Sequence, residues 1–300
     1  MTVLQNIDYS LTELFVSSHA NILVVIVLIG LIIGSFINVV AHRTPIIMMQ
    51  EWRQEINEFI AQDDSINVER ITEHSQAERK LSLSYPSSHC TACHHSLAWW
   101  QNIPILSFFI LSGRCAYCHA KISPSYLIVE LITALLSLLV VWCIGMNLQA
   151  IFALVLVWYL LTLSLIDIKV QLLPDRLLVP VGIIGLIANI YGSFTTLTLA
   201  VWGLVIGFVS FWFINTFFKL MTKKDGLGLG DAKLLSVLGA WLGVHVLPMV
   251  VFIAALLGVI IGSILGKKNQ AFAFGPYLSI GGIIALLWGE QLWAWYAIGF

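Results

Sequence analysis

The sequence predicts an all-α polytopic membrane protein with about eight transmembrane helices and one sizeable polar loop. Of its 300 residues, 59% are hydrophobic and only 10% are charged, whereas soluble domains average about 25% charged residues. Long apolar segments recur along the chain, each close to the roughly 20 residues that a helix needs to cross about 30 Å of hydrocarbon. The eight candidate spans are approximately residues 19–40, 124–145, 149–168, 175–193, 197–219, 231–245, 246–266 and 276–298.

The basic residues predict the orientation of these spans. All 15 Lys and Arg residues fall on one side of the eight-span arrangement, and the opposite connections, 145–149, 191–196 and 243–246, contain none. Because cationic residues accumulate in cytoplasmic loops, both termini are expected outside and the polar loop inside the cell. Residues 1–18 contain no Lys or Arg, so the first span is expected to be a permanent anchor and not a cleaved signal peptide.

The chain is expected to divide into three regions: an anchor helix over 1–41, a cytoplasmic domain over 42–123 and a membrane-embedded domain over 124–300. In the second region, apolar residues recur at helical spacing among charges over 48–60, which predicts an amphipathic helix. Residues 61–84 are polar and are expected to be flexible. The apolar segment 99–109 is expected to rest on the bilayer interface, where Trp is favoured.

Four cysteines in the polar loop predict a structural zinc site. Cys90 and Cys93 form one CxxC pair, and Cys115 and Cys118 form a second pair 21 residues later. Two such pairs can place four thiolates tetrahedrally around one metal ion, as in a zinc ribbon. Redox pairing or another metal remain alternatives, although a cytoplasmic location disfavours disulfides. The histidines beside these pairs are expected to be exposed loop residues, since four cysteines complete the site.

Two carboxylates at the edges of apolar segments are the candidate catalytic residues. Asp167 ends the third span, and Asp231 follows Gly228 and Gly230 at the start of the sixth. An acid at the centre of a spanning helix costs roughly 2.5–3.5 kcal/mol, so such residues are functional-site candidates. The glycines would permit an unusual backbone and close approach of a substrate chain, and a helix N-terminus would favour the Asp231 carboxylate.

Three uses of this aspartate pair stay open on chemical grounds. A pair that shares one proton can hydrolyse a peptide bond, with one carboxylate activating water and the other polarising the carbonyl. The pair can also relay protons in a transporter, or the two acids can belong to unrelated ion pairs. A third acid, Asp175, is expected to cap the next helix or to pair with Arg176. The turn at 274–277 is assigned no role.

Several motifs make the chain resemble the type IV prepilin peptidases, members of the GxGD intramembrane aspartyl proteases. The resemblance covers nearly the whole chain, and the motifs follow the family's order. They are GSFINVVAHR (34–43), the two CxxC pairs with QNIP and SGRC between them, ISPSYLIVEL (122–131), IDIKVQLLPD (166–175), GLGLGDAKLLSVLGAWLG (226–243) and FGPYL (274–278).

The resemblance implies a function for each region. Asp167 and Asp231 would be the catalytic pair, supported by Gly228 and Gly230, and Cys90, Cys93, Cys115 and Cys118 would hold zinc. The substrates would be prepilins and pseudopilins, whose short basic leader ends in Gly before a hydrophobic helix and is cut at the cytoplasmic face. Many members then methylate the new N-terminus with S-adenosylmethionine, for which the sequence singles out no ligand residue.

The resemblance also implies a location and partners. The protein would be a multi-pass protein of the bacterial inner membrane, with periplasmic termini and a cytoplasmic cysteine loop and active site. Membrane lipid is an expected partner, nucleic acid is not, and no particular oligomeric state is indicated.

Two positions depart from the family pattern. Gln101 stands where Glu is common before Asn-Ile-Pro, and Lys169 stands where a further acid is common. Because a basic residue cannot replace an acid, Lys169 strengthens the assignment of Asp167.

Overall fold

The structure, a computed structural model, describes residues 2–61, 81–223, 228–264 and 273–298. These residues form helices joined by turns, and the described ranges contain no β-strand, only two isolated β-bridges. They divide into two compact units, one of Met1–Gly34 with Glu130–Phe300 and the other of Ser35–Val129. The predicted all-helical class is confirmed. Residues 62–80, which hold most of the segment predicted to be flexible, lie outside the described residues.

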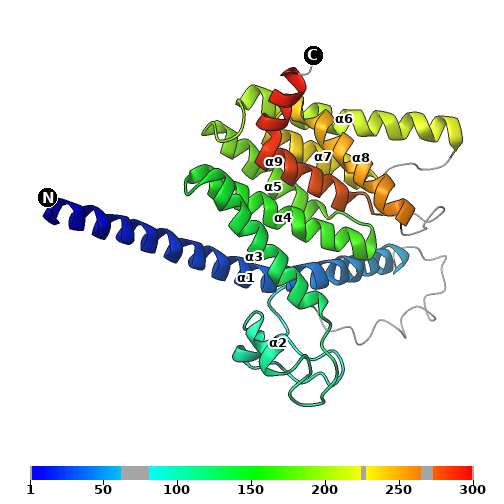
Figure 1. The fold of residues 1–300 in the computed structure, drawn as a ribbon. Helices are drawn as coiled ribbons and strands as arrows, with labels where there is room; N and C mark the ends of the chain where they lie inside the picture. Colours follow the sequence, from blue (N-terminus) through cyan, green and yellow to red (C-terminus); the bar gives the residue numbers. More distant parts are fainter. Residues whose placement is uncertain (1, 62–80, 224–227, 265–272, 299–300) are drawn as a thin grey trace. The chain divides into compact units, whose positions relative to one another are not determined.

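A helix forms at each of the eight segments predicted from the sequence (Figure 1). The helices are α1 (Thr2–Ala61), α3 (Ser125–Ile144), α4 (Leu148–Val170), α5 (Asp175–Ile190), α6 (Leu197–Thr222), α7 (Leu229–Leu242), α8 (Leu247–Ile264) and α9 (Gly275–Ile298).

Five of these helices are long and apolar enough to cross a membrane. They are Asn21–Ile60 of α1, α3, α4, α6 and the segment Val244–Ile264 that contains α8. The eight-span count predicted from the sequence is therefore not confirmed. α5 and α7 have only 16 and 14 residues, fewer than the roughly 20 that a lone span needs. α9 is long enough but includes the polar residues Glu290 and Gln291.

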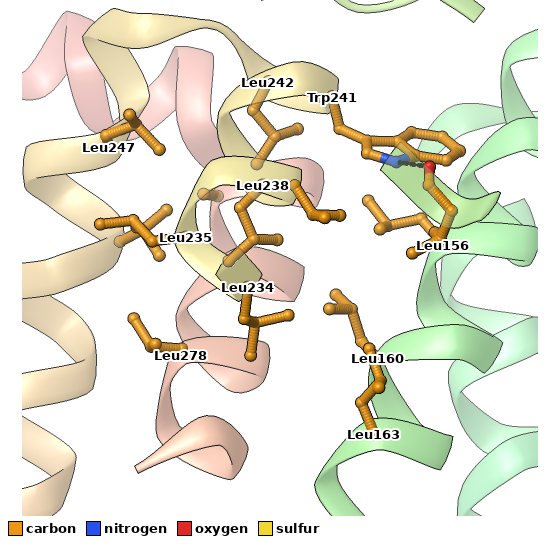
Figure 2. Close-up of a cluster of buried hydrophobic side chains, with 14 of the residues drawn as sticks. Leu156, Leu160, Leu163, Leu234, Leu235, Leu238, Trp241, Leu242, Leu247 and Leu278 are labelled. Carbon is orange, nitrogen blue, oxygen red and sulfur yellow. Dashed lines mark hydrogen bonds between the residues drawn. The ribbon is translucent and has the colours of Figure 1, made fainter. Parts of the chain in front are cut away.

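The short helix α7 forms the centre of the larger unit (Figure 2). Every residue from Leu234 to Leu242 is buried, because α5, α6, α8 and α9 all pack against this helix. Leucines of α4 face it as well, and Trp241 closes the cluster by donating its indole N–H to the Val181 carbonyl over 2.8 Å. A helix that is apolar all round is a buried helix. α7 is therefore surrounded by protein, whereas an ordinary span is surrounded by lipid. Because it does not have to match the thickness of the hydrocarbon layer, it can be as short as about 21 Å, at 1.5 Å per residue.

Small residues allow α6 to approach α7 closely. A Cβ atom on Gly203 would collide with the Gly239 backbone, and one on Gly207 would lie 2.8 Å from the Leu235 carbonyl oxygen. The Ser236 hydroxyl also donates to the Leu204 carbonyl at 2.7 Å. Such small-residue contacts and hydrogen bonds drive helix association in membranes, because lipid tails are as apolar as the side chains and there is no hydrophobic driving force between helices. They fix the α7 backbone, and with it the residues at the start of α7.

A single amide side chain fastens the other end of α7. The Asn189 Nδ2 group donates to the carbonyl oxygens of Ala240 and Trp241, each at 2.9 Å. Its Oδ1 atom accepts from the backbone N–H groups of Phe194 and Thr195 at 3.1 and 3.0 Å. The last carbonyls of a helix have no partner within the helix, so Asn189 satisfies two of them inside an apolar core.

The smaller unit contains the second half of α1 and the cysteine loop. α1 continues through Pro45 to Ala61, so the helix predicted over 48–60 is the end of this longer one. The Arg43 guanidinium, which is buried, donates to the carbonyls of Ser82, Leu83 and Pro86 at 3.0, 3.1 and 2.7 Å. These bonds attach residues 82–86 of the loop to α1, two residues after the predicted domain boundary at 41.

Candidate functional site

The four cysteines predicted to bind zinc form one cluster. Their sulfur atoms all lie within 4.8 Å of one another, and the Sγ atoms of Cys90 and Cys118 are 3.8 Å apart. A tetrahedral site with Zn–S bonds of about 2.3 Å has edges of about 3.8 Å. The donor set and its spacing therefore fit a structural zinc ion.

Two matching turns build this cluster. In the first turn the His94 N–H donates to the Cys90 carbonyl at 2.9 Å, and in the second the His119 N–H donates to the Cys115 carbonyl at 3.1 Å. His94 and His119 both adopt positive φ, 56° and 57°. Each turn also directs a backbone N–H at its first cysteine, from Ala92 to Cys90 Sγ and from Tyr117 to Cys115 Sγ. The histidines thus act as turn residues, and the cluster of candidate ligands consists of the cysteines.

The thiols of the cluster differ in acidity. The backbone N–H groups of Cys93 and Ala92 lower the pKa of Cys90 to about 6. The backbone N–H of Ala120 lowers the pKa of Cys118, but desolvation and the neighbouring thiols of Cys93, Cys115 and Cys90 together outweigh it and raise that pKa to about 11. Adjacent thiolates repel one another, and a bound cation removes that cost while it displaces the protons. The cluster is therefore chemically suited to a divalent metal ion.

The segment between the two turns combines one buried amide with exposed apolar residues. Gln101 lies in a short 3₁₀-helix (Trp99–Asn102), is buried, and accepts the Ala98 N–H at 2.9 Å. Trp99 is 80% exposed, and Phe109 and Ile110 at the end of α2 (Leu106–Ile110) are also exposed. This exposure agrees with an apolar surface, while its predicted contact with the bilayer stays a prediction.

Asp167 lies three residues before the end of α4 and is only 4% exposed. Its Oδ2 atom accepts a hydrogen bond of 2.9 Å from the backbone N–H of Gly275, the first residue of α9. A buried carboxylate needs such a donor, and a helix N-terminus, where partial positive charge gathers, is a favourable one. Asp167 is therefore held between the end of one helix and the start of another.

Asp231 is the third residue of α7 and is 9% exposed. Its N–H donates to the Gly228 carbonyl at 3.1 Å, and its carboxyl group accepts from the Gly228 backbone. The predicted position at a helix N-terminus is confirmed. The charge of Asp167 acts on Asp231, so the fold brings near each other two carboxylates that are 64 positions apart in the sequence.

The two glycines before Asp231 have different surroundings. Gly228 has φ −69° and ψ 140°, an extended conformation open to any residue, and a Cβ atom there would contact Asp231 Oδ2 at 3.4 Å. At Gly230 a Cβ atom would lie 3.0 Å from the Leu173 Cβ atom. The need for a small residue is therefore greater at Gly230, where α7 meets the turn after α4.

Two interactions near the aspartates were not predicted. Asp175 was expected to cap α5 or to pair with Arg176, but Pro174 holds the cap position and makes no side-chain cap bond. Lys233 Nζ contacts the two Asp175 carboxylate oxygens at 2.6 and 2.8 Å. The second is the Gly275 donor, which lies in the turn at 274–277 that had been left without a role.

This arrangement defines a class of protein: a helical membrane protein with a four-cysteine cluster in one unit and a buried pair of carboxylates in the other. Two carboxylates that come within hydrogen-bonding distance cannot easily both ionise. Such a pair can supply an acid and a base together.

Comparison with known proteins identifies the family. Residues 28–144 match the family model described as the bacterial peptidase A24 N-terminal domain, and residues 154–263 match the type IV leader peptidase family. The chain is 44% identical over 271 residues to a prepilin leader peptidase/N-methyltransferase of Pseudomonas aeruginosa, covering 89% of this chain and 90% of that protein. It is 40% identical over 301 residues to the protein of the same name from Aeromonas salmonicida, covering 99% and 98%.

The chain therefore belongs to the type IV leader peptidase family, as its motifs predicted, and it is an enzyme of the peptidase class. No solved structure matches it.

Proposed function

We propose that this protein removes the short basic leader of type IV prepilins and pseudopilins with Asp167 and Asp231 as its catalytic pair. The observation that supports this most is the pair itself: two buried carboxylates, close enough to interact, at adjoining helix ends. The relatives are named as prepilin leader peptidases, and this favours peptide hydrolysis over proton relay in a transporter.

In this proposal the pair holds one proton. The ionised carboxylate takes a proton from a water molecule, whose oxygen attacks the scissile carbonyl carbon, while the protonated carboxyl donates to the carbonyl oxygen. When the tetrahedral intermediate collapses, the C–N bond breaks and the leaving amine takes the proton that the first carboxylate removed from water. The second carboxyl group recovers its proton from a hydroxyl of the intermediate, so the pair again holds one proton. The Gly275 and Gly228 backbone groups keep the two carboxyl groups oriented throughout.

We further propose that the same chain methylates the new N-terminal amine, because its relatives carry the N-methyltransferase name. S-adenosylmethionine would be the methyl donor. Zinc held by the four cysteines would act structurally, by fixing the loop between α1 and α3.

The proposed location is the bacterial inner membrane. The distribution of Lys and Arg supports periplasmic termini, with the cysteine loop and both aspartates toward the cytoplasm. This orientation would place the active site on the side where the basic prepilin leader is made.

The first prediction concerns the two aspartates. Asp167→Asn and Asp231→Asn, each alone, should reach the membrane but fail to shorten a prepilin, because an amide cannot exchange the proton that the reaction needs. Purified enzyme is incubated with prepilin and labelled S-adenosylmethionine, and mass spectrometry of the pilin N-terminus reads cleavage and methylation together.

Glu290→Gln is the matched control, because it makes the same carboxyl-to-amide change on an exposed residue of α9. This variant should cleave like the wild type. Full cleavage by either aspartate variant would contradict the proposed pair, and proton-coupled uptake into vesicles without any cleavage would favour a transporter.

A further inference from the structure

The start of α9 reaches the aspartate pair through its backbone. The Gly275 N–H donates to Asp167 Oδ2 over 2.9 Å in a buried position, although 108 residues separate the two. Gly275 has no side chain with chemistry of its own, so its contribution is this one N–H group.

The residue at 275 must be glycine for the bond to form as it does. A Cβ atom there would lie 2.7 Å from Asp167 Oδ2 and 3.2 Å from its Cγ, inside the contact distance of a real side chain. Any larger residue would push the carboxyl group away from the helix end. The glycine is therefore required for close approach of backbone to carboxylate.

The neighbouring residues leave Gly275 as the donor that α9 offers. Pro276 has no N–H, and the N–H groups of Tyr277 and Leu278 both donate to the Phe274 carbonyl, at 3.1 and 3.2 Å. The first N–H groups of a helix have no partner within it. The order Phe-Gly-Pro-Tyr thus directs the positive end of α9 onto one carboxylate through one bond.

We propose that the N-terminus of α9 is a positioning element of the active site, in which the Gly275 N–H sets the orientation of the Asp167 carboxyl group toward Asp231. This inference rests on the proposed peptidase function. Gly275 touches neither the water nor the scissile bond; it acts through Asp167. Misplacement of a reacting group by about 1 Å can cost 10²-fold in rate, so the bond should matter for turnover more than for substrate binding.

The experiment measures kcat and KM for prepilin cleavage in Gly275→Ala and in Gly281→Ala. The control is closely matched, because a Cβ atom at Gly281 of the same helix would also lie 2.7 Å from an oxygen, the carbonyl of Val250. Gly275→Ala should lower kcat about 10- to 100-fold with KM near that of wild type. Gly281→Ala should lower the melting temperature but leave kcat within about twofold, since it disturbs only helix packing.

A second variant removes the N–H without adding an atom. Gly275 is replaced by glycolic acid, so that an ester oxygen stands where the N–H was, and Leu148, the first residue of α4, receives its hydroxy-acid analogue as the control. The Gly275 ester should lower kcat about tenfold, and the Leu148 ester should not. The comparison of the two ester variants tests the positioning role even if Gly275→Ala does not fold.

The outcomes separate the two proposals. If cleavage by the wild type requires both aspartates but the Gly275 ester matches the wild type, the positioning role is wrong and the peptidase proposal stands. Equal losses of kcat in the two alanine variants, together with equal losses in the two esters, would likewise overturn it. Cleavage that needs neither aspartate would overturn both.

Discussion

At the scale of single residues, the polar groups buried in the helical unit differ in how well they are satisfied. Asp167 and Asn189 each accept or donate hydrogen bonds across the chain. Ser279 of α9 is 2% exposed, and within the described part of the chain its hydroxyl has no hydrogen-bond partner. A buried polar atom without a partner costs free energy, so the hydroxyl of Ser279 is expected to be dispensable.

Ser279→Ala should leave the melting temperature in detergent unchanged or raise it. The corresponding gain in the free energy of unfolding should be at most about 1 kcal/mol. Ser236→Ala is the opposite control, since that hydroxyl donates to the Leu204 carbonyl at 2.7 Å, and its loss should cost about 1 kcal/mol. Thermal unfolding of the two variants and the wild type compares them. An equal loss in both would mean that the Ser279 hydroxyl has a partner.

The residues with distinctive side-chain chemistry could be found in the sequence. The two aspartates stand where a charge is expensive, and the cysteines repeat at a spacing that suits one metal ion. The Gly275 donor could not be found in this way, because a backbone N–H is present at almost every position and its partner lies 108 residues away. The Lys233–Asp175 contact was not predicted either, because Arg176 is adjacent to Asp175 in the sequence whereas Lys233 is 58 positions away.

At the scale of helices, the start of α5 and the start of α7 are joined by the ion pair of Asp175 and Lys233. Lys233 is 40% exposed and Asp175 is 60% exposed, and such surface pairs contribute about 0.2–1 kcal/mol. Because Lys233 follows Asp231 by two residues, the pair also restrains the first turn of α7.

Reversing the charges tests this restraint. Asp175→Lys or Lys233→Asp alone should lower the melting temperature, because like charges then face each other, and the double reversal should recover most of the loss. The recovery should shrink as salt is added, since exposed charges are screened. Additive losses in the double variant would show that the two residues do not interact.

The presence of the helices was predicted better than the residues at which they begin and end. Apolar segments of the right length located all eight, because hydrophobicity is the strongest signal in such a chain. The prediction did not foresee that α1 continues through Pro45, since an interior proline usually ends or kinks a helix. It also counted 231–245, the segment of α7, among the candidate spans, because hydropathy alone cannot distinguish burial in protein from burial in lipid.

At the scale of the whole molecule, the two units have different sources of stability. The larger unit contains the leucine-rich core around α7 (Figure 2). The loop of the smaller unit leaves Trp99, Phe109 and Ile110 exposed and has few buried residues, among them Cys115 and Gln101. A small region without a core of its own depends on metal binding for much of its stability.

Zinc removal should therefore act on one unit only. Wild-type protein should contain about one zinc per chain, and a Cys90→Ser, Cys93→Ser double variant should contain almost none. After treatment with a chelator, limited proteolysis should cut within 86–123 and leave the α4–α9 region intact. Absence of zinc in the wild type with all four thiols reactive would contradict the metal site, and cleavage throughout the chain would contradict the separation of the units.

The enclosure of α7 has a consequence for how the enzyme responds to its membrane. A span that faces lipid tilts or shifts when the bilayer becomes thicker or thinner, to relieve hydrophobic mismatch. α7 packs against α5, α6, α8 and α9, so these neighbours and not the acyl chains determine its depth. Asp231 is carried by α7, so its depth is expected to follow the packing of the helical unit and not the length of the lipid chains.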